Sequence, residues 1–168
     1  MKRISYLEAM AGTAEHMAHG GVFLSVGGEQ PNVMTIGWGW MGPCWGKDVF
    51  VALVRPQRHT YEMIKRAGAF TVSVPTALPL REELVFAGTK SGRDVNKFDG
   101  HGLTAAPAQQ VNAPIIAECG LHFECKTLLV QDMTGDRMDP GVLQKAYPAR
   151  DFHTMFFGEI VDCYRTDD

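Results

Sequence analysis

Short apolar runs separated by glycine and proline fill most of the chain after residue 21, and they restrict its possible folds more than any other feature. The runs with β character are 22–27, 33–41, 48–54, 69–74, 116–131 and 153–164. Helices are expected at 5–18, near 60, at 80–87 and at 92–98, and loops at 99–114 and 132–150. Because strands outnumber helices and do not alternate regularly with them, the pattern argues against a doubly wound parallel sheet. The sequence predicts a mainly β fold, a mostly antiparallel barrel with peripheral helices.

Length and composition indicate a single domain that covers residues 1–168. The chain is 45% hydrophobic and 21% charged, which is too apolar for a disordered protein. Its net charge of −3 argues against a general binder of nucleic acid or of anionic membranes. No apolar run reaches about 18 residues, and Glu8 and Glu15 interrupt the region that a secretion signal would need. We therefore expect a cytoplasmic protein.

The charge is distributed unevenly along the chain. Between Arg55 and Lys97 there are eight basic and four acidic residues, so this stretch carries +4 and the remainder carries −7. A basic stretch inside an acidic protein can serve a small anionic ligand, although the same distribution can arise by chance.

A glycine-rich segment, Gly37 to Gly42, matches the pattern G-x-G-x-x-G of dinucleotide-binding loops, but its context is wrong. In those folds the third glycine opens a helix, whereas here Pro43 and a turn follow. If 33–41 is a strand, Gly37 and Gly39 leave one of its faces nearly free of side chains. Such a face can accept a flat ring system or a second backbone, or it can mark a strongly twisted strand. The sequence leaves these interpretations open.

One segment of the basic stretch combines two arginines with an expected helix start. Thr60 is the expected N-cap of a short helix, and Arg55 and Arg58 precede it. A helix start offers free N–H groups to a phosphate, and the arginines would add charge-assisted hydrogen bonds. The alternative is a capped helix with two solvated arginines.

A second segment of the same kind begins at Thr89. Ser91 and Asp94 have the spacing of a capping box for the helix expected at 92–98. Gly92 permits close approach of the backbone, and Lys97 adds a cation. Two such segments in one basic stretch favour a phosphorylated aromatic cofactor over two unrelated helix caps.

The cysteines and histidines do not indicate a metal site. Cys119, His122 and Cys125 are close in sequence, but in a strand His122 would point away from the face that the two cysteines share. The sequence contains no Cys-x-x-Cys pair. We expect buried thiols and no metal.

Several motifs, in order, resemble the flavin reductase-like family of FMN-binding split-barrel proteins, most closely its flavoredoxin type. The matching segments are 32–38, 54–60, 70–75, 91–98, 124–126 and 153–160. The resemblance implies a Greek-key split barrel that forms a homodimer, with FMN bound non-covalently near the dimer interface. Trp40 and Trp45 could serve that interface or ordinary packing.

The resemblance also implies which residues bind the cofactor. Those expected along the flavin are Asn32, Met34, Thr35, Ile36, Gly37, Trp38 and, less directly, His153. Those expected around the ribityl phosphate are Val54, Arg55, Arg58, His59, Thr60, Ser91, Gly92 and Lys97.

The implied activity is redox chemistry centred on the flavin, without a catalytic side chain. FMN would accept a hydride from NAD(P)H and pass electrons to a free flavin or to a redox protein partner. Thr35 could tune the flavin by a hydrogen bond near its N5 atom. The alternatives are a flavoredoxin-type electron carrier with little direct NAD(P)H activity, and a split-barrel protein that binds haem or only dimerises.

Overall fold

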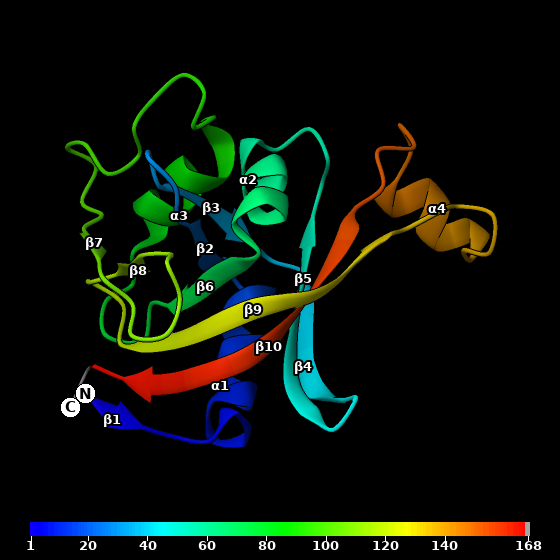
Figure 1. Cartoon of the computed structure of the whole chain (residues 1–168). Helices are drawn as coiled ribbons and strands as arrows, with labels where there is room; N and C mark the ends of the chain where they lie inside the picture. The colour runs from blue at the N-terminus through cyan, green and yellow to red at the C-terminus, as the bar shows by residue number, and fades with distance from the viewer. Residues whose placement is uncertain (167–168) are drawn as a thin grey trace.

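The computed structural model describes residues 1–166, and one antiparallel sheet forms its centre (Figure 1). The sheet contains β1 (Lys2–Arg3), β2 (Val22–Val26), β3 (Asn32–Ile36), β4 (Gly39–Cys44), β5 (Lys47–Val54), β6 (Ala69–Val74), β9 (Leu121–Asp132) and β10 (Thr154–Arg165). A separate pair is formed by β7 (Ala105–Ala106) and β8 (Ile115–Ile116). The helices are α1 (Tyr6–Ala18), α2 (His59–Ala67), α3 (Arg81–Thr89) and α4 (Pro140–Ala146).

The strand order is β3-β2-β6-β9-β10-β5-β4, with β1 beside β10, and every pair is antiparallel. Although β3 and β4 follow each other in the chain, they lie at opposite ends of this order. Within residues 1–166 no strand ladder joins β3 to β4 or β5, so the barrel is split along this seam. The predicted mainly β, antiparallel split barrel is confirmed.

The core lies on the concave side of this sheet, where apolar side chains alternate along the strands. Phe50, Phe70, Phe123 and Phe156 are fully buried there. The two long strands β9 and β10 must bend to enclose these rings, and their register shifts at Phe157/Gly158 and Ile160/Asp162. A Cβ atom at Gly158 would lie 2.6 Å from the Phe70 ring, so the close packing of this ring against β10 requires glycine.

The expected strand at 33–41 is in fact two strands, and this prediction was wrong. The chain pairs with β2 as far as Ile36 and with β5 from Gly39 on, so it breaks where it crosses from one partner to the other. A Cβ atom at Gly39 would lie 2.5 Å from Val51 O. This glycine therefore admits a neighbouring backbone and does not form a shelf for a ring.

Two helix predictions also need correction. Arg58, not Thr60, is the N-cap of α2, because the helix begins two residues earlier than expected. The helix expected at 92–98 is a turn, in which Asp94 N and Val95 N donate to Ser91 O at 3.1 and 3.2 Å. The hydroxyl of Ser91 accepts from Arg93 N at 3.1 Å, as in a cap, but no helix continues.

The region expected as a loop at 132–150 contains α4, which sits on an arm between β9 and β10 that projects from the body (Figure 1). Asp139 caps this helix by accepting from Gly141 N and Val142 N at 2.9 and 3.0 Å, and Pro140 occupies its first turn. The pair Asp139 and Pro140 therefore begins a helix in a region where the sequence predicted only a loop. The loop expected at 99–114 is likewise interrupted by β7.

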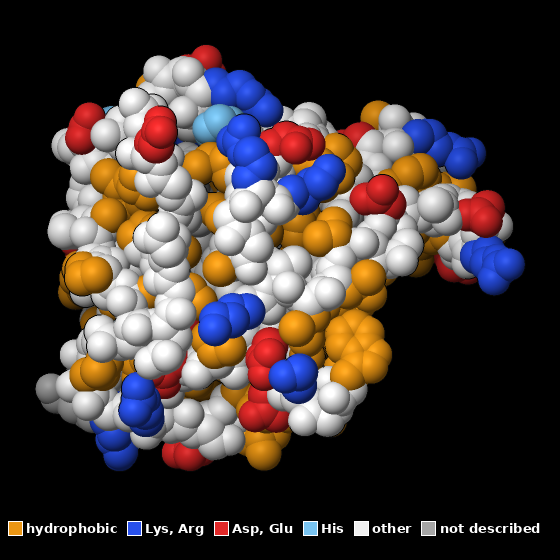
Figure 2. Space-filling view, viewed as in Figure 1, with side chains coloured by type: hydrophobic (Ala, Val, Ile, Leu, Met, Phe, Trp, Pro, Cys, Tyr) orange, Lys and Arg blue, Asp and Glu red, His pale blue; other side chains and the backbone are white. Residues whose placement is uncertain are grey.

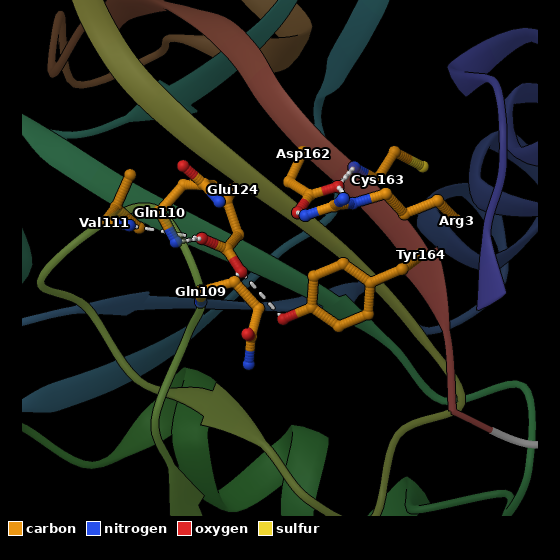
Figure 3. Close-up of polar contacts among 8 residues, drawn as sticks. All are labelled: Arg3, Gln109, Gln110, Val111, Glu124, Asp162, Cys163 and Tyr164. Carbon is orange, nitrogen blue, oxygen red and sulfur yellow. Dashed lines mark hydrogen bonds and ion pairs between the residues drawn. The ribbon is translucent and has the colours of Figure 1, made fainter. Parts of the chain in front are cut away.

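The buried carboxylate of Glu124 on β9 fastens the loop at 107–112 to the sheet (Figure 3). It accepts from the backbone N–H groups of Gln109, Gln110 and Val111 at 2.7, 2.6 and 3.2 Å. The Tyr164 hydroxyl donates to the same carboxylate at 2.8 Å. We call this set of contacts the Glu124 latch.

Cys119 and Cys125 were expected on one face of a single strand, but β9 begins only at Leu121. Cys119 therefore packs in a second apolar cluster beside α3, and Cys125 packs in the main core. His122 hydrogen-bonds to Ser73 at 3.0 Å and to Thr166 at 3.1 Å. Among residues 1–166, no helix has both the length and the apolar character to cross a bilayer.

Candidate functional site

A cavity of about 450 Å³ opens at the seam of the split barrel, and we call it the ring cavity. Its walls come from β3, from the crossing between β3 and β4, from the end of β5 and the loop before α2, and from the residue just before β10. The lining residues are Met34, Thr35, Ile36, Gly37, Trp38, Leu53, Arg55, Gln57, Arg58 and His153.

A smaller cavity of about 120 Å³ lies between the start of α2 and the turn after α3, and we call it the phosphate pocket. Its lining residues are Asn32, Met34, Gln57, Arg58, His59, Thr60, Thr89, Lys90, Ser91, Gly92 and Lys97. Met34, Gln57 and Arg58 line both cavities, so the two are adjacent.

These two cavities bring together all but one of the fifteen residues that the sequence predicted. The exception is Val54, which is fully buried in the main core and lines neither cavity. Gln57 and Leu53 were missed, although Gln57 lies between the two predicted arginines. Thr89 and Lys90 were also missed as binding residues, although the basic segment begins with them.

The phosphate pocket is shaped by a close approach of two chain segments. Asn32 Nδ2 donates to Thr60 Oγ1 at 2.8 Å and so joins β3 to the first turn of α2. A Cβ atom at Gly92 would overlap the Asn32 amide and lie 2.9 Å from the His59 ring. A side chain at this position would therefore have to displace the Asn32 amide. The first turn of α2 lies at this pocket, because His59 and Thr60 both line it.

A buried cation without an anionic partner lies against the pocket. Lys97 is only 3% exposed, and its Nζ donates to Val33 O at 2.7 Å and to Ala87 O at 2.8 Å. Within residues 1–166 no carboxylate forms an ion pair with it. Burial, followed by repulsion from Arg58, lowers the pKa of Lys97 to about 8.

Burial and nearby cations also lower the pKa values of Arg58 and His59, which line the same pocket. Burial and then Arg55 lower the pKa of Arg58, whose guanidinium donates to Gly88 O. The pKa of His59 is lowered by burial and then by three cations, Arg93 first. Figure 2 shows Lys and Arg side chains gathered with a histidine over the region of α2 and α3. An anion bound here would relieve this repulsion.

His153 lies in a directed chain of hydrogen bonds at the edge of the ring cavity. Arg55 Nε can only donate, so the His153 Nε2 atom 3.4 Å away must accept, and the ring proton is on Nδ1. Nδ1 then donates to Tyr147 Oη at 2.8 Å, and that hydroxyl donates to Met133 Sδ at 3.7 Å. Burial, Arg55 and Arg58 lower the pKa of His153 to about 4. The imidazole is therefore neutral at pH 7.

The arm closes one side of this site. Arg55 pairs with Asp151 and lies 5.6 Å from the Tyr147 ring centre. The Trp38 indole packs against His153, with ring centres 4.9 Å apart. The residues at the root of the arm thus hold Trp38 and Arg55 in place beside the cavity.

Thr35 cannot act as a hydrogen-bond donor toward a ligand in this structure. Its hydroxyl donates to Leu84 O at 2.5 Å, and a hydroxyl carries a single proton. The expected hydrogen bond between Thr35 and the flavin near N5 stays a prediction. Because the hydroxyl proton is used by Leu84 O, Thr35 could take part in that bond only as the acceptor.

Comparisons with known proteins agree with this arrangement. Residues 14–168 match the profile of the family described as flavin reductase like domain. A protein of Archaeoglobus fulgidus described only as uncharacterized is 33% identical over 141 residues, which cover 83% of this chain and 68% of that protein. The curated relatives are thus longer than the present chain.

Two solved structures illustrate the structural likeness. The flavoredoxin of Desulfovibrio vulgaris (Miyazaki F) has a TM-score of 0.67 at 25% identity, over 87% of this chain and 69% of that one. The NADH:FAD oxidoreductase SgcE6 of Streptomyces globisporus C-1027 has a TM-score of 0.65 at 21% identity, over 87% of this chain and 75% of that one. At 21% identity the likeness shows the fold alone.

Proposed function

The chain belongs to the flavin reductase-like family, and on that premise we propose that it binds FMN non-covalently and works as an NAD(P)H-dependent flavin oxidoreductase. The isoalloxazine ring would occupy the ring cavity, and the phosphate would occupy the phosphate pocket. The bound flavin would supply the two-electron redox chemistry, taking a hydride from NAD(P)H and passing electrons to a free flavin or a protein.

The observation that carries this proposal is the buried Lys97, which forms no ion pair within residues 1–166 and lies beside a pocket where a side chain at position 92 would overlap Asn32. An ammonium has three donors, and two of them are used by Val33 O and Ala87 O. The third donor and the positive charge are left for an anion. The pocket volume of about 120 Å³ suits a single phosphate, and the adjoining cavity of about 450 Å³ is of ligand size.

The protein's own side chains would bind, orient and shield the cofactor and would not transfer protons. His153 is neutral, and both of its ring nitrogens are engaged by Arg55 and Tyr147. Arg58 and Lys97 would neutralise the phosphate, and Trp38 would cover one side of the ring cavity. Side chains that bind the cofactor, together with a flavin that carries the redox chemistry, fit a flavin-centred reaction.

A second function, electron exchange with a protein partner, is favoured by the exposed indole of Trp38 in the cavity wall. It is 47% exposed, so the ring cavity opens toward a surface that another protein could reach. The likeness to a flavoredoxin at 25% identity also supports this alternative. The two functions share the FMN site and differ only in the reaction with nicotinamide.

Anaerobic stopped-flow mixing separates the two functions. FMN-loaded protein is mixed with NADH or NADPH, and flavin absorbance is followed. Rapid bleaching supports the reductase; slow bleaching with both nucleotides, together with rapid bleaching by a reduced redox protein, supports the electron carrier. If the folded protein binds no FMN when incubated with an excess of it, both proposals fail.

We also propose that the protein is a homodimer with the flavin near the interface. Trp40, Val51, Phe157 and Leu129 lie opposite one another on adjacent strands, so they form an apolar row on the side of the sheet away from the core. Trp40 is 49% exposed in the single chain. In Figure 2, hydrophobic side chains gather in the corner between the β4–β5 hairpin and the arm.

This row adjoins the ring cavity, which supports a flavin at the interface. Leu53 lines the cavity, and its N–H donates to Trp38 O at 3.3 Å, two residues along the strands from the pair Trp40 and Val51. Light scattering after gel filtration tests the dimer. Trp40→Asp should give monomers, whereas Leu7→Asp, at an exposed site on α1, should not. Wild-type protein that is monomeric at tens of micromolar would contradict the proposal.

A further inference from the structure

The arm, residues 133–153 between β9 and β10, projects from the body and needs contacts that hold it beside the ring cavity (Figure 1). Its helix α4 contains no buried residue, so the helix itself contributes no buried packing. Tyr147, which follows α4, is only 2% exposed. From the body, the Trp38 ring centre lies 6.2 Å from that of Tyr147, and the Arg55 guanidinium carbon lies 5.6 Å from it. The arm is therefore attached largely through Tyr147 and the side chains around it.

Arg55 donates hydrogen bonds to the arm at three places, and we call these contacts the Arg55 clamp. Its Nε donates to His153 Nε2 at 3.4 Å, one terminal nitrogen donates to the Asp151 carboxylate, and the other donates to Ala146 O at 3.4 Å. These contacts use more than half of the donors that a guanidinium carries. Gln57 Nε2 donates to the same Asp151 carboxylate at 3.3 Å. Two side chains from the loop before α2, both in the wall of the ring cavity, are thus fastened to the arm.

Arg55 and Arg58 differ in the anionic partner that the chain gives them. Arg55 pairs with the Asp151 carboxylate, whereas Arg58 donates to Gly88 O and forms no ion pair within residues 1–166. Arg58 lines both cavities, and Arg55 lines the ring cavity but not the phosphate pocket. The family resemblance placed both arginines at the ribityl phosphate. Of the two, only Arg58 has the position and a charge without a carboxylate partner.

We propose that Arg55 is a positioning residue that clamps the arm to the barrel and shapes the part of the site that holds the isoalloxazine ring, and that it does not bind the phosphate. Through His153 it also supports Trp38, whose ring centre lies 4.9 Å from that of the imidazole. The wall that Arg55 supports is the same for a ligand with or without a phosphate. This inference rests on the proposed flavin site, because the clamp affects binding only if a flavin ring occupies the ring cavity.

The test is a calorimetric titration of cofactor-free protein with riboflavin and with FMN. Arg55→Gln should weaken the binding of both ligands about three- to tenfold, with the two factors equal within about twofold. Arg58→Gln is the matched comparison at the phosphate pocket, and it should weaken FMN at least about fivefold more than riboflavin. Lys65→Gln removes a cation from α2 outside both cavities and should change neither affinity.

Two further variants separate a clamp from simple attraction between Arg55 and a phosphate. Asp151→Asn breaks the clamp from the side of the arm, so it should weaken both ligands, and adding Arg55→Gln to it should cost less than about a further twofold. If Arg55 bound the phosphate, loss of the competing carboxylate would instead strengthen FMN binding. Arg55→Lys keeps the charge, but one ammonium cannot reproduce the guanidinium fork, so the clamp predicts no recovery for either ligand.

Limited trypsin digestion measures the clamp without any ligand. Lys145 and Arg150 are exposed on the arm, and cleavage beside them requires local opening of the chain. Arg55→Gln and Asp151→Asn should each increase the rate of cleavage in the arm about three- to tenfold, whereas Lys65→Gln should leave this rate unchanged. Circular dichroism verifies that each variant is folded, and Asp151→Asn serves alone if Arg55→Gln does not fold.

Three results would overturn the role of Arg55 while leaving the flavin site intact. They are a loss in Arg55→Gln at least about fivefold larger for FMN than for riboflavin, tighter FMN binding by Asp151→Asn, and unchanged binding of both ligands by Arg55→Gln. Unchanged cleavage of the arm in both variants would equally contradict the clamp. If the folded wild-type protein binds neither riboflavin nor FMN, the proposed function fails, and this inference fails with it.

Discussion

The sharpest test of the site is the replacement of Lys97 by methionine. Methionine has a similar length and no charge, so the substitution removes the buried cation and largely keeps its packing. In the folded protein the pKa of Lys97 is lowered from 10.5 to about 8. At about 1.4 kcal/mol for each pKa unit, the buried charge costs the cofactor-free protein about 3 kcal/mol at neutral pH.

The substitution also removes the two hydrogen bonds to Val33 O and Ala87 O, which offsets most of that gain. A hydrogen bond from a charged donor contributes ~1.5–3 kcal/mol. The free energy of unfolding of cofactor-free Lys97→Met should therefore differ from that of the wild type by less than about 2 kcal/mol. Urea unfolding followed by circular dichroism measures it.

The lowered pKa of Lys97 also fixes how the free energy of unfolding should change with pH. Because the folded protein holds the proton on Lys97 more weakly than the unfolded chain does, the full cost of the charge is present below pH 8. The cost disappears as the pH rises from about 8 to 10.5. Over this interval the wild type should gain stability relative to Lys97→Met.

The effect on binding should depend on the phosphate of the ligand. Loss of one charge-assisted hydrogen bond should weaken FMN binding by ~1.5–3 kcal/mol, or about ten- to 150-fold. Riboflavin, which has no phosphate, should bind both proteins within about twofold. Equal losses for FMN and riboflavin, measured by calorimetry, would refute the assignment of Lys97 to the phosphate.

Three further substitutions probe other parts of the site and the fold. Gly92→Ala should weaken FMN binding at least about tenfold, measured by fluorescence titration, because its Cβ would overlap the Asn32 amide; unchanged binding would contradict the pocket geometry. His153→Gln should reduce the loss of stability of the cofactor-free protein between pH 6.5 and 4, since the folded wild type resists protonation of His153 there; urea unfolding at pH 7 and 5 checks this. Glu124→Gln should lower stability by ~1–3 kcal/mol, and the melting temperature by several degrees, while FMN affinity changes less than about twofold.

The residues that line the two cavities could be predicted largely because they are close in sequence. Arg55, Arg58 and His59 lie in one short segment after a strand, and the fold keeps them together whatever the exact cap of α2. The error at Thr60 therefore did not displace it from the pocket, although its hydroxyl accepts from Asn32 instead of capping the helix.

Long-range contacts account for what the sequence could not reveal. The partner of His153 is Tyr147, whose position depends on how the arm folds back onto β10. Glu124 has the sequence context of an ordinary strand residue, and only the path of the loop at 107–112 makes it a buried latch. The capping box predicted for Ser91 and Asp94 was wrong: the Ser91 hydroxyl accepts from Arg93 N, Asp94 N donates to the Ser91 carbonyl, and a turn takes the place of the predicted helix.

The open seam of the barrel explains why the cavities lie where they do. Within residues 1–166, β3 is paired only with β2, so its other edge carries backbone groups that no strand uses. Lys97 marks this edge, because its ammonium binds Val33 O. Alternate residues of a strand direct their N–H and C=O groups to the same side, so the backbone groups of Thr35 face the same edge as Val33 O. Thr35 lines the ring cavity, so the backbone N–H and C=O of this unpaired strand edge would be a donor and an acceptor for a ligand bound there. A closed barrel would have used those groups in its own ladder and left no polar edge for a ring to bind.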